Sequence, residues 1–290
     1  MASFDIDALR AAISGVDNGS FARAAVELGR SQSAVSMQLK KLEQQAGQQL
    51  FERRGRGLVP TEAGEALLQY ARRIIALNDE AARALGAKVA PETVRLGLPQ
   101  DFYDDIMPAT VRAFAERNAD AHVSVRAGNN HKIHEDILEG RLDAAIAFFQ
   151  RGSAAKGDLL CELPLLWVAH SDFPVVGANQ EVPLVLFNHR CLFRQTAIVQ
   201  LDRAKKPWRA ALTTPSLAAV WSGLRSHFGV GVRVGHAVPD DIRDVSDWPD
   251  LPDLPTIELR LLRSAKGGSR ADEMCALLRE QTLAYVGSAT

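Results

Sequence analysis

The segment from residue 20 to residue 41, SFARAAVELGRSQSAVSMQLKK, constrains the fold of this chain more than any other stretch. Apolar residues recur at helical spacing on both sides of a break at residues 29–31, which predicts two short helices. Gly29 allows the backbone to turn sharply there, and Ser31 is a good N-cap for the second helix. The pattern is typical of a helix-turn-helix, although an ordinary helical hairpin in an all-helical domain would produce a similar one.

The outward face of the predicted second helix carries polar side chains and ends in cations. Such a face suits base edges first and phosphates second, so double-stranded DNA is the first partner to consider. The residues expected to contact DNA from this helix are Gln32, Ser33, Ser36, Met37, Lys40 and Lys41.

A short basic ribbon follows the two helices. Residues 50–53 and 58–60 predict two strands joined by a tight turn. A ribbon of this kind, or wing, can lay Arg53, Arg54 and Arg56 against a sugar-phosphate backbone or into a minor groove. The ribbon therefore favours the helix-turn-helix interpretation over the ordinary hairpin.

The distribution of charge agrees with DNA binding through one part of the chain. The 290 residues carry a net charge of −1. Residues 20–60 hold seven cations and three acids, a local charge of +4, so the remainder of the chain sums to −5. A basic N-terminal patch on a mildly acidic body is the expected footprint of a protein with one DNA-binding domain.

With these motifs in place, the sequence resembles the LysR-type transcriptional regulators. The stretch that carries the resemblance is SFARAAVELGRSQSAVSMQLKKLEQQAGQQLFERRGRGLVPTEAGEALLQYARRI. Arg30, Met37, QYARRIIALNDEA, VRLGLPQDF, KPWRAALTTPSLAAV and DLPDLP are similar to the LrhA/HexA-like branch, so the resemblance covers essentially the whole chain. Most LysR-type proteins carry an Arg or a similar donor at the position of Met37, so their base readout does not extend to this residue. The resemblance implies a regulator that binds double-stranded DNA and a small-molecule effector.

One long helix is predicted from Thr61 to about Leu85, because this stretch contains no proline and Thr61 can cap it. Six residues of this helix follow the 4-3-4-3-4 spacing of a coiled-coil seam: Leu67, Ala71, Ile74, Asn78, Ala81 and Leu85. The helix could instead be buried on its own domain, but the chain offers no obvious partner helix of similar length. The resemblance implies that the partner is a second copy, in a homodimer or a homotetramer.

Beyond the linker the pattern changes to strands that alternate with helices. Residues 94–149 predict a βαβαβ unit with a parallel sheet, and a similar unit begins near residue 165. A final amphipathic helix at residues 272–285 is expected to return to the first unit, as in LysR-type effector domains. The predicted fold is α+β and multidomain: a winged helix-turn-helix at 1–60, a linker helix at 61–88, and an α/β effector domain of periplasmic-binding-protein type at 92–290. Within the effector domain, subdomain I takes about 92–163 and 265–290, and subdomain II takes about 164–264.

Two α/β units joined by two crossovers leave a cleft, and ligands of such sheets bind at the carboxyl ends of strands near helix N-termini. Four loops meet this description, and the resemblance implies that they face the effector. Each polar residue in them could instead simply cap a helix. The residues expected to bind the effector are Pro99, Gln100, Asp101, Asn129, Asn130, Phe148, Phe149, Cys191, Phe193, Arg194, Thr214 and Ser216.

Other chemistries find little support in the sequence. Cys191 at a helix start could sense oxidants, but the three cysteines are widely separated and no second cysteine stands at a plausible spacing. The sequence HKIHE at residues 131–135 matches neither zinc-protease motif, so no metal ligand is predicted. No GxSxG motif, P-loop or GxGxxG occurs, so we expect no enzyme activity and no cofactor.

The expected location is the cytoplasm, with no membrane partner. The N-terminus lacks a positive region followed by an apolar run, and no apolar stretch reaches membrane-spanning length. The alternative function is a small-molecule-binding protein of periplasmic type that does not bind DNA. The arginine-rich wing and the absence of a signal sequence argue against it.

Overall fold

The computed structural model has two compact units, with the division near residue 91, and each is described by itself. The residues that the structure describes are 3–54, 57–85, 93–128, 130–177, 180–188, 191–236, 238–265 and 267–288.

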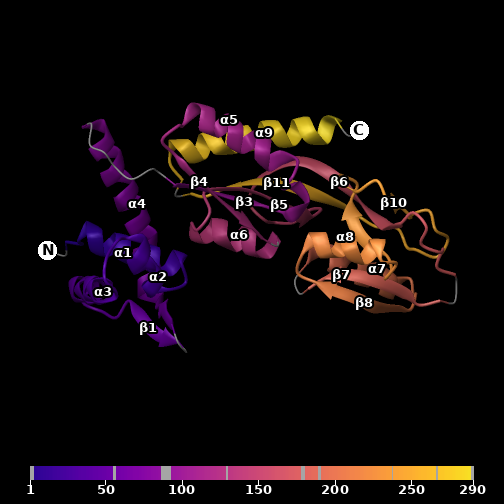
Figure 1. The fold of residues 1–290 in the computed structure, drawn as a ribbon, viewed down its shortest axis with the longest axis horizontal. Helices are drawn as coiled ribbons and strands as arrows, with labels where there is room; N and C mark the ends of the chain where they lie inside the picture. Colours follow the sequence, from indigo (N-terminus) through magenta and orange to yellow (C-terminus); the bar gives the residue numbers. More distant parts are fainter. Residues whose placement is uncertain are drawn as a thin grey trace. The chain divides into compact units, whose positions relative to one another are not determined.

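The N-terminal unit is a helical bundle with a two-stranded antiparallel wing (Figure 1). Its elements are α1 (Ile6–Asp17), α2 (Phe21–Glu27), α3 (Gln32–Ala46), β1 (Phe51–Arg54), β2 (Gly57–Pro60) and α4 (Glu62–Ala84). Leu9, Leu42 and Leu50 lie at the centre of its apolar core. The predicted first helix, helix-turn-helix and wing are confirmed. The cap of the long helix is confirmed as well, because the Gly64 N–H donates to Thr61 Oγ1 at 3.1 Å.

One face of the first half of α4 packs into the core of its own unit, which corrects the predicted seam at Ala71. Ala71 is only 1% exposed, in the core that α4 shares with α1, so it is not available to a second copy of the chain. Two ion pairs join the same helices: Arg72 bonds Asp17 at 2.5 Å, and Arg10 bonds Asp79. The apolar side chains that α4 leaves exposed form a neighbouring stripe. They are Tyr70, Ile74 and Leu77, and Leu85 is exposed directly after the helix ends.

The C-terminal unit alternates strands and helices, as predicted. Its first half comprises β3 (Thr93–Leu98), the 3-10 turn η1 (Gln100–Phe102), α5 (Ile106–Arg117), β4 (His122–Ala127), α6 (Asn130–Glu139), β5 (Ala144–Gln150) and β6 (Asp158–His170). Its second half comprises β7 (Val182–Phe187), α7 (Leu192–Arg203), β8 (Trp208–Thr214), α8 (Leu217–Arg225), β9 (Gly231–Val234), β10 (Ile242–Asp244), β11 (Thr256–Arg263) and α9 (Ser269–Ser288).

The strand order of the large sheet explains how two subdomains share one chain. The order is β10-β6-β11-β5-β3-β4, with β9 also paired to β6, and β3 runs parallel to both β4 and β5. Strands β6 and β11 pair antiparallel and continue from the first subdomain into the second, so they form the two crossovers. The second subdomain adds a separate parallel pair, β7 and β8.

Helices cover both faces of the sheet in the first subdomain. Helices α5 and α9 lie on one face and α6 lies on the other (Figure 1). Phe102 meets Tyr285 edge-on at 6.3 Å, so the final helix does return to the first subdomain, as predicted. This packing brings residues from the two ends of the effector region into one apolar core.

Three details of the second subdomain differ from the sequence prediction. The strand predicted at residues 165–169 belongs to the 13-residue strand β6. The helix expected to reach Phe228 ends at Arg225, and the following His227 has a left-handed backbone with φ of 57°. Strands β9 and β10 were not predicted, because each is only three or four residues long and is defined by its pairing with β6.

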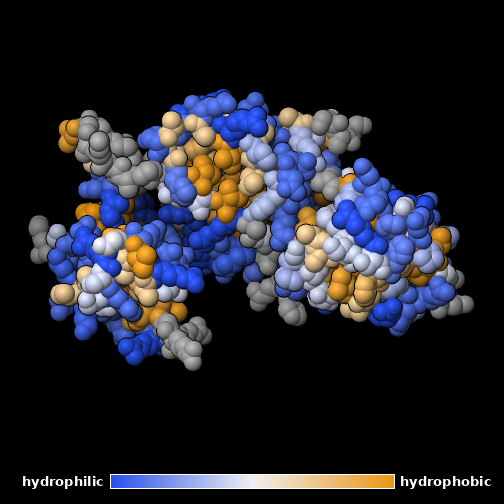
Figure 2. Space-filling model, viewed as in Figure 1, coloured by the Kyte–Doolittle hydropathy of each residue, from blue (hydrophilic) through white to orange (hydrophobic). Residues whose placement is uncertain are grey.

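Apolar side chains are mostly gathered in the cores of the two units. The face in Figure 2 is largely hydrophilic, with separate apolar patches. Among the described residues, no helix is both long and apolar enough to cross a bilayer.

Candidate functional site

Helix α3 presents a polar face outside the N-terminal core. Gln32, Ser33, Ser36, Met37 and Lys40 are all exposed on it, and Met37 exposes 67% of its surface. The opposite face buries three apolar residues at helical spacing in the core: Val35, Leu39 and Leu42. Because the apolar face is buried in the core, the polar face points outward, where it can contact a partner.

The start of α3 is set by local interactions that the sequence predicted. Gly29 has φ of 61°, a left-handed backbone that a residue with a side chain rarely adopts. Ser31 caps the helix, because its Oγ accepts from the Ala34 N–H at 3.2 Å. The Ser31 hydroxyl also lies 2.9 Å from that of Ser33, a residue of the exposed face.

The wing is held to α3 by a residue that sequence reasoning missed. Glu43 Oε1 accepts from the backbone N–H groups of Leu50 at 2.9 Å and Phe51 at 3.1 Å. Phe51 also packs edge-on against Phe21 of α2, with ring centroids 5.4 Å apart. Nothing in the spacing of Glu43 signals this role, because the bond depends on where the chain turns after α3.

The predicted DNA-contacting cations differ in their surroundings. Arg53 is exposed on β1. Lys41 bonds Asp5 at 2.6 Å, and this bond, together with backbone N–H donors, holds the pKa of Asp5 below its ordinary value. The side chain of Arg54 and the whole of Arg56 lie outside what the structure describes.

In the C-terminal unit, four loops converge on a cavity of about 280 Å³ between the subdomains. The first subdomain contributes the ends of β3, β4 and β5, and the second contributes β7 and the starts of α7 and α8. The lining residues are Pro99, Gln100, Asp101, Gly128, Asn130, Phe148, Phe187, Asn188, Cys191, Leu192, Phe193 and Pro215. Seven of the twelve residues expected to bind the effector are among them, so the structure brings the predicted loops together.

Four of the expected effector residues point elsewhere. Phe149 packs edge-on against His134 of α6, on the face of the sheet opposite Phe148. Arg194 donates to the Phe187 carbonyl at 3.2 Å. Thr214 Oγ1 accepts from the Ser216 N–H at 3.3 Å, so these two residues shape the start of α8 and do not line the cavity. Asn129 lies outside the described residues.

Two polar side chains of the cavity brace its walls. Gln100 Oε1 accepts from the Leu217 N–H at 2.8 Å, which joins the first subdomain to the N-terminus of α8. Asn130 Oδ1 accepts from the Phe148 N–H at 3.0 Å. The Gln100 oxygen therefore bonds the start of a helix and the Asn130 oxygen bonds the end of a strand, close to the helix-capping role that was the alternative interpretation of such residues.

Arg233 on β9 is the main residue that the sequence did not predict. Its side chain is buried, and its Nη1 lies 3.8 Å from Asp101 Oδ1 in the cavity wall. Its guanidinium lies over the rings of Phe187 at 4.5 Å and Phe193 at 5.3 Å. No local signal marks Arg233, because β9 is a short strand that is brought beside Asp101 only through its pairing with β6.

Cys191 does not have the surroundings of an oxidant sensor. It is the N-cap of α7, but its side chain makes no capping hydrogen bond. Burial raises the pKa of the Cys191 thiol, so little of the reactive thiolate forms near neutral pH.

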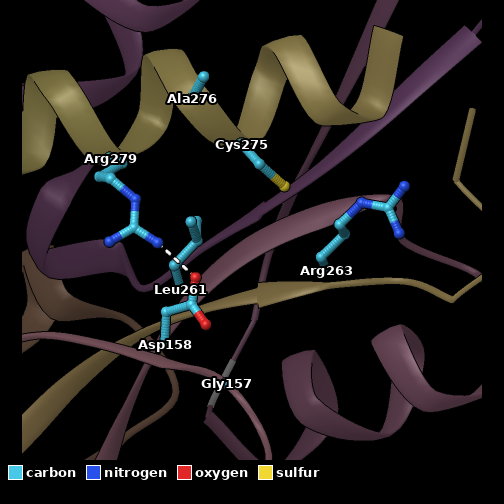
Figure 3. Close-up of a pocket in the computed structure, with 7 residues that line it drawn as sticks. All are labelled: Gly157, Asp158, Leu261, Arg263, Cys275, Ala276 and Arg279. Atoms are coloured by element: carbon cyan, nitrogen blue, oxygen red, sulfur yellow. Dashed lines mark hydrogen bonds and ion pairs between the residues drawn. The ribbon is translucent and has the colours of Figure 1, made fainter. Parts of the chain in front are cut away.

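A second cavity of about 340 Å³ lies between β11, the start of β6 and α9 (Figure 3). Its arginines are paired within the protein, Arg279 with Asp158 and Arg263 with Asp272. Burial raises the pKa of the Cys275 thiol there to about 11. Internal pairing of these charges makes this cavity a weaker candidate for ligand binding than the one between the subdomains.

The fold and the two sites define a class of protein: a DNA-binding winged helix-turn-helix regulator with a two-subdomain sensor. Residues 6–65 match the family described as bacterial regulatory helix-turn-helix protein, lysR family, and residues 88–282 match the LysR substrate binding domain. The chain belongs to the LysR family of transcriptional regulators, and is not an enzyme.

Two relatives and one solved structure illustrate the similarity. The chain is 32% identical over 244 residues to the transcriptional regulator DgdR of Burkholderia cepacia, covering 84% of this chain and 82% of DgdR. It is 30% identical over 241 residues to PecT of Dickeya dadantii, covering 83% of this chain and 76% of PecT. Full-length LysG of Corynebacterium glutamicum, solved with bound effector Arg, shares the fold with a TM-score of 0.65 at 19% identity, covering 97% of this chain and 98% of LysG.

Proposed function

We propose that this LysR-family regulator binds its operator as a homodimer, and that a small molecule in the cavity between the subdomains sets its affinity for DNA. The observation that supports the DNA-binding role most directly is the exposed polar face of α3 beside a wing that carries exposed Arg53. A helix of this kind fits the major groove, and the wing contacts the adjacent backbone.

In the proposed complex, the residues near the start of α3 read bases while cations hold the backbone. Gln32, Ser33 and Ser36 face base edges, with Met37 beside them. Lys40, Lys41, Arg53, Arg54 and Arg56 contact phosphate or the minor groove. Lys41 must exchange its bond to Asp5 for a phosphate, which reduces the net gain from that contact.

The exposed stripe on α4 supports a dimer. Ile74 and Leu77 expose apolar surface along the distal part of this helix, and Leu85 is exposed directly after it. A second copy of α4 would cover this surface. Asn78 and Ala81 are exposed beside this stripe and fit the same interface, whereas Ala71 does not. Pairs of dimers could assemble into tetramers through the C-terminal units, where Figure 2 shows an apolar patch beside α5.

The cavity supports an effector-binding role. It joins two subdomains that are linked by only two crossovers, so a ligand that prefers one angle between them would shift the regulator toward that arrangement. LysG carries the effector Arg in its solved structure, and we infer a comparable effector-binding role here.

Finer assignments follow from the sequence. We place the chain in the LrhA/HexA-like branch on stretches such as VRLGLPQDF and DLPDLP. We divide it into a DNA-binding domain at 1–60, a linker helix at 61–88 and an effector domain at 92–290. A regulator that binds chromosomal DNA works in the cytoplasm of a bacterium.

The test of the DNA interface is a binding titration on DNA from the region flanking the gene, repeated over a range of salt concentrations. Arg53→Ala should weaken binding to all sequences and lower the salt slope by about one, because one phosphate contact is lost. Ser33→Ala should change the difference in binding free energy between the preferred sequence and its single-base variants by roughly 1–3 kcal/mol, which is the contribution of one base contact.

Arg151→Ala is the matched control, since it removes an exposed arginine from the C-terminal unit that pairs with Glu162 at 3.1 Å. It should leave affinity and salt slope unchanged. If Arg53→Ala behaved like Arg151→Ala, the wing would not lie on DNA. If the parent protein bound no DNA from this region more tightly than random DNA, the regulator would not act there.

A further inference from the structure

The start of helix α1 places two acids beside the helix that is proposed to read DNA. Asp5 is the N-cap of α1, and Asp7 lies in its first turn. The Asp5 N–H donates to Gln45 Oε1 at 3.3 Å, which ties this turn to the last part of α3. Both acids precede residue 20, so the local charge of +4 over residues 20–60 does not include them. The surface around α3 is therefore less positive than that count indicates.

Each acid pairs with a cation near one end of α3. Asp7 Oδ2 accepts from Arg30 Nη2 at 2.7 Å, and Arg30 directly precedes Ser31, the N-cap of α3. Asp5 Oδ2 accepts from Lys41 Nζ at 2.6 Å. All four charged side chains are partly exposed, between 34% and 56%. Exposed ion pairs contribute little to stability, so a stronger anion can open both of them.

Arg30 and Lys41 mark one flank of α3, because both reach the same turn of α1. Residues three or four apart lie on the same side of a helix, so this flank also includes Ala34 and Gln38, which are half-buried. The exposed Met37 adjoins it on the side proposed to face the bases. A flank next to the base-facing side of a recognition helix faces the sugar-phosphate backbone, which borders the major groove.

Arg30 has the position and the chemistry to bind a phosphate. The N-terminal residues of a recognition helix approach DNA closely, and Arg30 lies two residues before α3 begins. A guanidinium can present two N–H groups to two phosphate oxygens. Duplex DNA carries one negative charge for about every 1.7 Å of its axis, so it offers Arg30 more anionic acceptors than the single carboxylate of Asp7 does.

We propose, on the basis of the DNA-binding role above, that Arg30 is a further phosphate contact and that Asp7 and Asp5 compete with DNA for Arg30 and Lys41. In the free protein the two acids hold both cations in place. On DNA, each cation exchanges its carboxylate for a phosphate, and the released carboxylate then lies near the negatively charged backbone. The two acids therefore lower the affinity for every DNA sequence, because they oppose the part of binding that does not depend on sequence.

The experiment measures binding of the full-length protein to a random duplex and to DNA from the region flanking the gene, between about 50 and 200 mM salt. Asp7→Asn removes the charge and keeps the size of the side chain. At the lowest salt it should tighten binding to both duplexes by about twofold to fivefold. The gain should shrink as the salt concentration rises, because salt screens exposed charges.

Arg30→Gln is the complementary change. It should weaken binding to both duplexes and lower the salt slope by up to about one, because a phosphate contact is lost. Asp7→Asn should then change the affinity much less in the Arg30→Gln protein than in the parent, because the acid no longer has this cation to hold. Asp5→Asn keeps a residue that caps helices well, and should tighten DNA binding through Lys41 in the same way.

Two control variants separate competition for DNA from other effects of the substitutions. Asp120→Asn makes the same change in an exposed acid of the C-terminal unit, which pairs with Arg270 at 2.8 Å, and should leave affinity and salt slope unchanged. Asp7→Glu keeps the negative charge and should bind DNA nearly as the parent does. Melting curves from circular dichroism should be similar for all variants, because each substitution removes only an exposed ion pair.

Three results would overturn the proposal. Unchanged or weaker binding by Asp7→Asn would exclude competition, and unchanged binding by Arg30→Gln would remove Arg30 from the DNA interface. Equal effects of Asp7→Asn with and without Arg30 would show that the acid does not act through this cation. The proposed function is judged separately, by whether the parent binds the flanking DNA more tightly than the random duplex. If it did not, that function would fail, while the random duplex would still decide the competition.

Discussion

Replacement of Leu77 by lysine tests the proposed dimer most directly. Leu77 is 67% exposed on the distal half of α4, where the second copy is expected to cover it. Full burial of a leucine side chain contributes about 2 kcal/mol, so burial of the exposed two-thirds contributes about 1.3 kcal/mol in each copy. The residue occurs twice in a symmetric interface, so Leu77→Lys should weaken the dimer by close to 3 kcal/mol, or roughly a hundredfold in dissociation constant.

Sedimentation velocity over a range of concentrations measures this dissociation constant. At concentrations where both proteins are monomeric, circular dichroism should show the same melting temperature for the parent and for Leu77→Lys, because Leu77 does not contribute to the core of its own unit. Val175→Lys is the matched control: Val175 is 56% exposed on the C-terminal unit, so the same chemical change is made away from α4. This variant should remain a dimer.

Ala71→Lys distinguishes the observed stripe from the seam predicted by sequence. Because Ala71 is buried under α1, a lysine there should unfold the N-terminal unit, not merely separate the copies. A Leu77→Lys protein that dimerised at parental concentrations would refute the proposed interface. A folded, monomeric Ala71→Lys protein would show instead that the predicted seam was right.

Two further predictions concern stability. A Cβ on Gly64 would lie 2.0 Å from the Leu50 carbonyl oxygen. In a urea titration, Gly64→Ala should therefore lower the free energy of unfolding of the N-terminal unit by about 2–3 kcal/mol, although alanine has the better helix propensity. Unchanged stability would contradict the close approach. Burial raises the pKa of Cys275 from about 9 to about 11. The thiol therefore ionises at lower pH in the unfolded chain than in the folded one, so its contribution to stability is complete below pH 9 and is lost as the pH rises toward 11. The stability difference between the parent and Cys275→Ala should therefore narrow by about 2 kcal/mol over that range, and a constant difference would show that the thiol titrates normally.

The family assignment resolves the choice between DNA binding and ligand binding alone. A periplasmic-type binding protein was the alternative interpretation of the C-terminal half. The match over residues 6–65 and the relatives that align over more than four-fifths of the chain place both halves in one regulator. The effector domain and the DNA-binding unit therefore belong to the same chain, so a ligand of the effector domain is expected to act on transcription.

The N-terminal unit could be predicted almost completely from sequence, because its determinants are local. Gly29 and Ser31 set the turn and the start of α3 through their own backbone and hydroxyl group. The exposed face of α3 follows from its apolar spacing, since Val35 and Leu39 must point inward. Local periodicity failed on α4, because the apolar spacing placed Ala71 in a seam between two copies, and only the packing of α1 shows that it belongs to the core of its own unit.

Apart from β9 and β10, the order of strands and helices in the C-terminal unit could also be predicted from sequence, and so could the convergence of its loops. Parallel strands place their carboxyl ends together, so the loops after β3, β4 and β5 had to share one edge. Which side chains enter the cavity depended on tertiary structure. Phe148 and Phe149 are neighbours on one strand and must face opposite sides, but the sequence does not say which side meets the second subdomain. Arg233 lies beside Asp101 of the cavity wall only because β9 pairs with β6, a strand from an earlier part of the chain, so its position was decided by the fold alone.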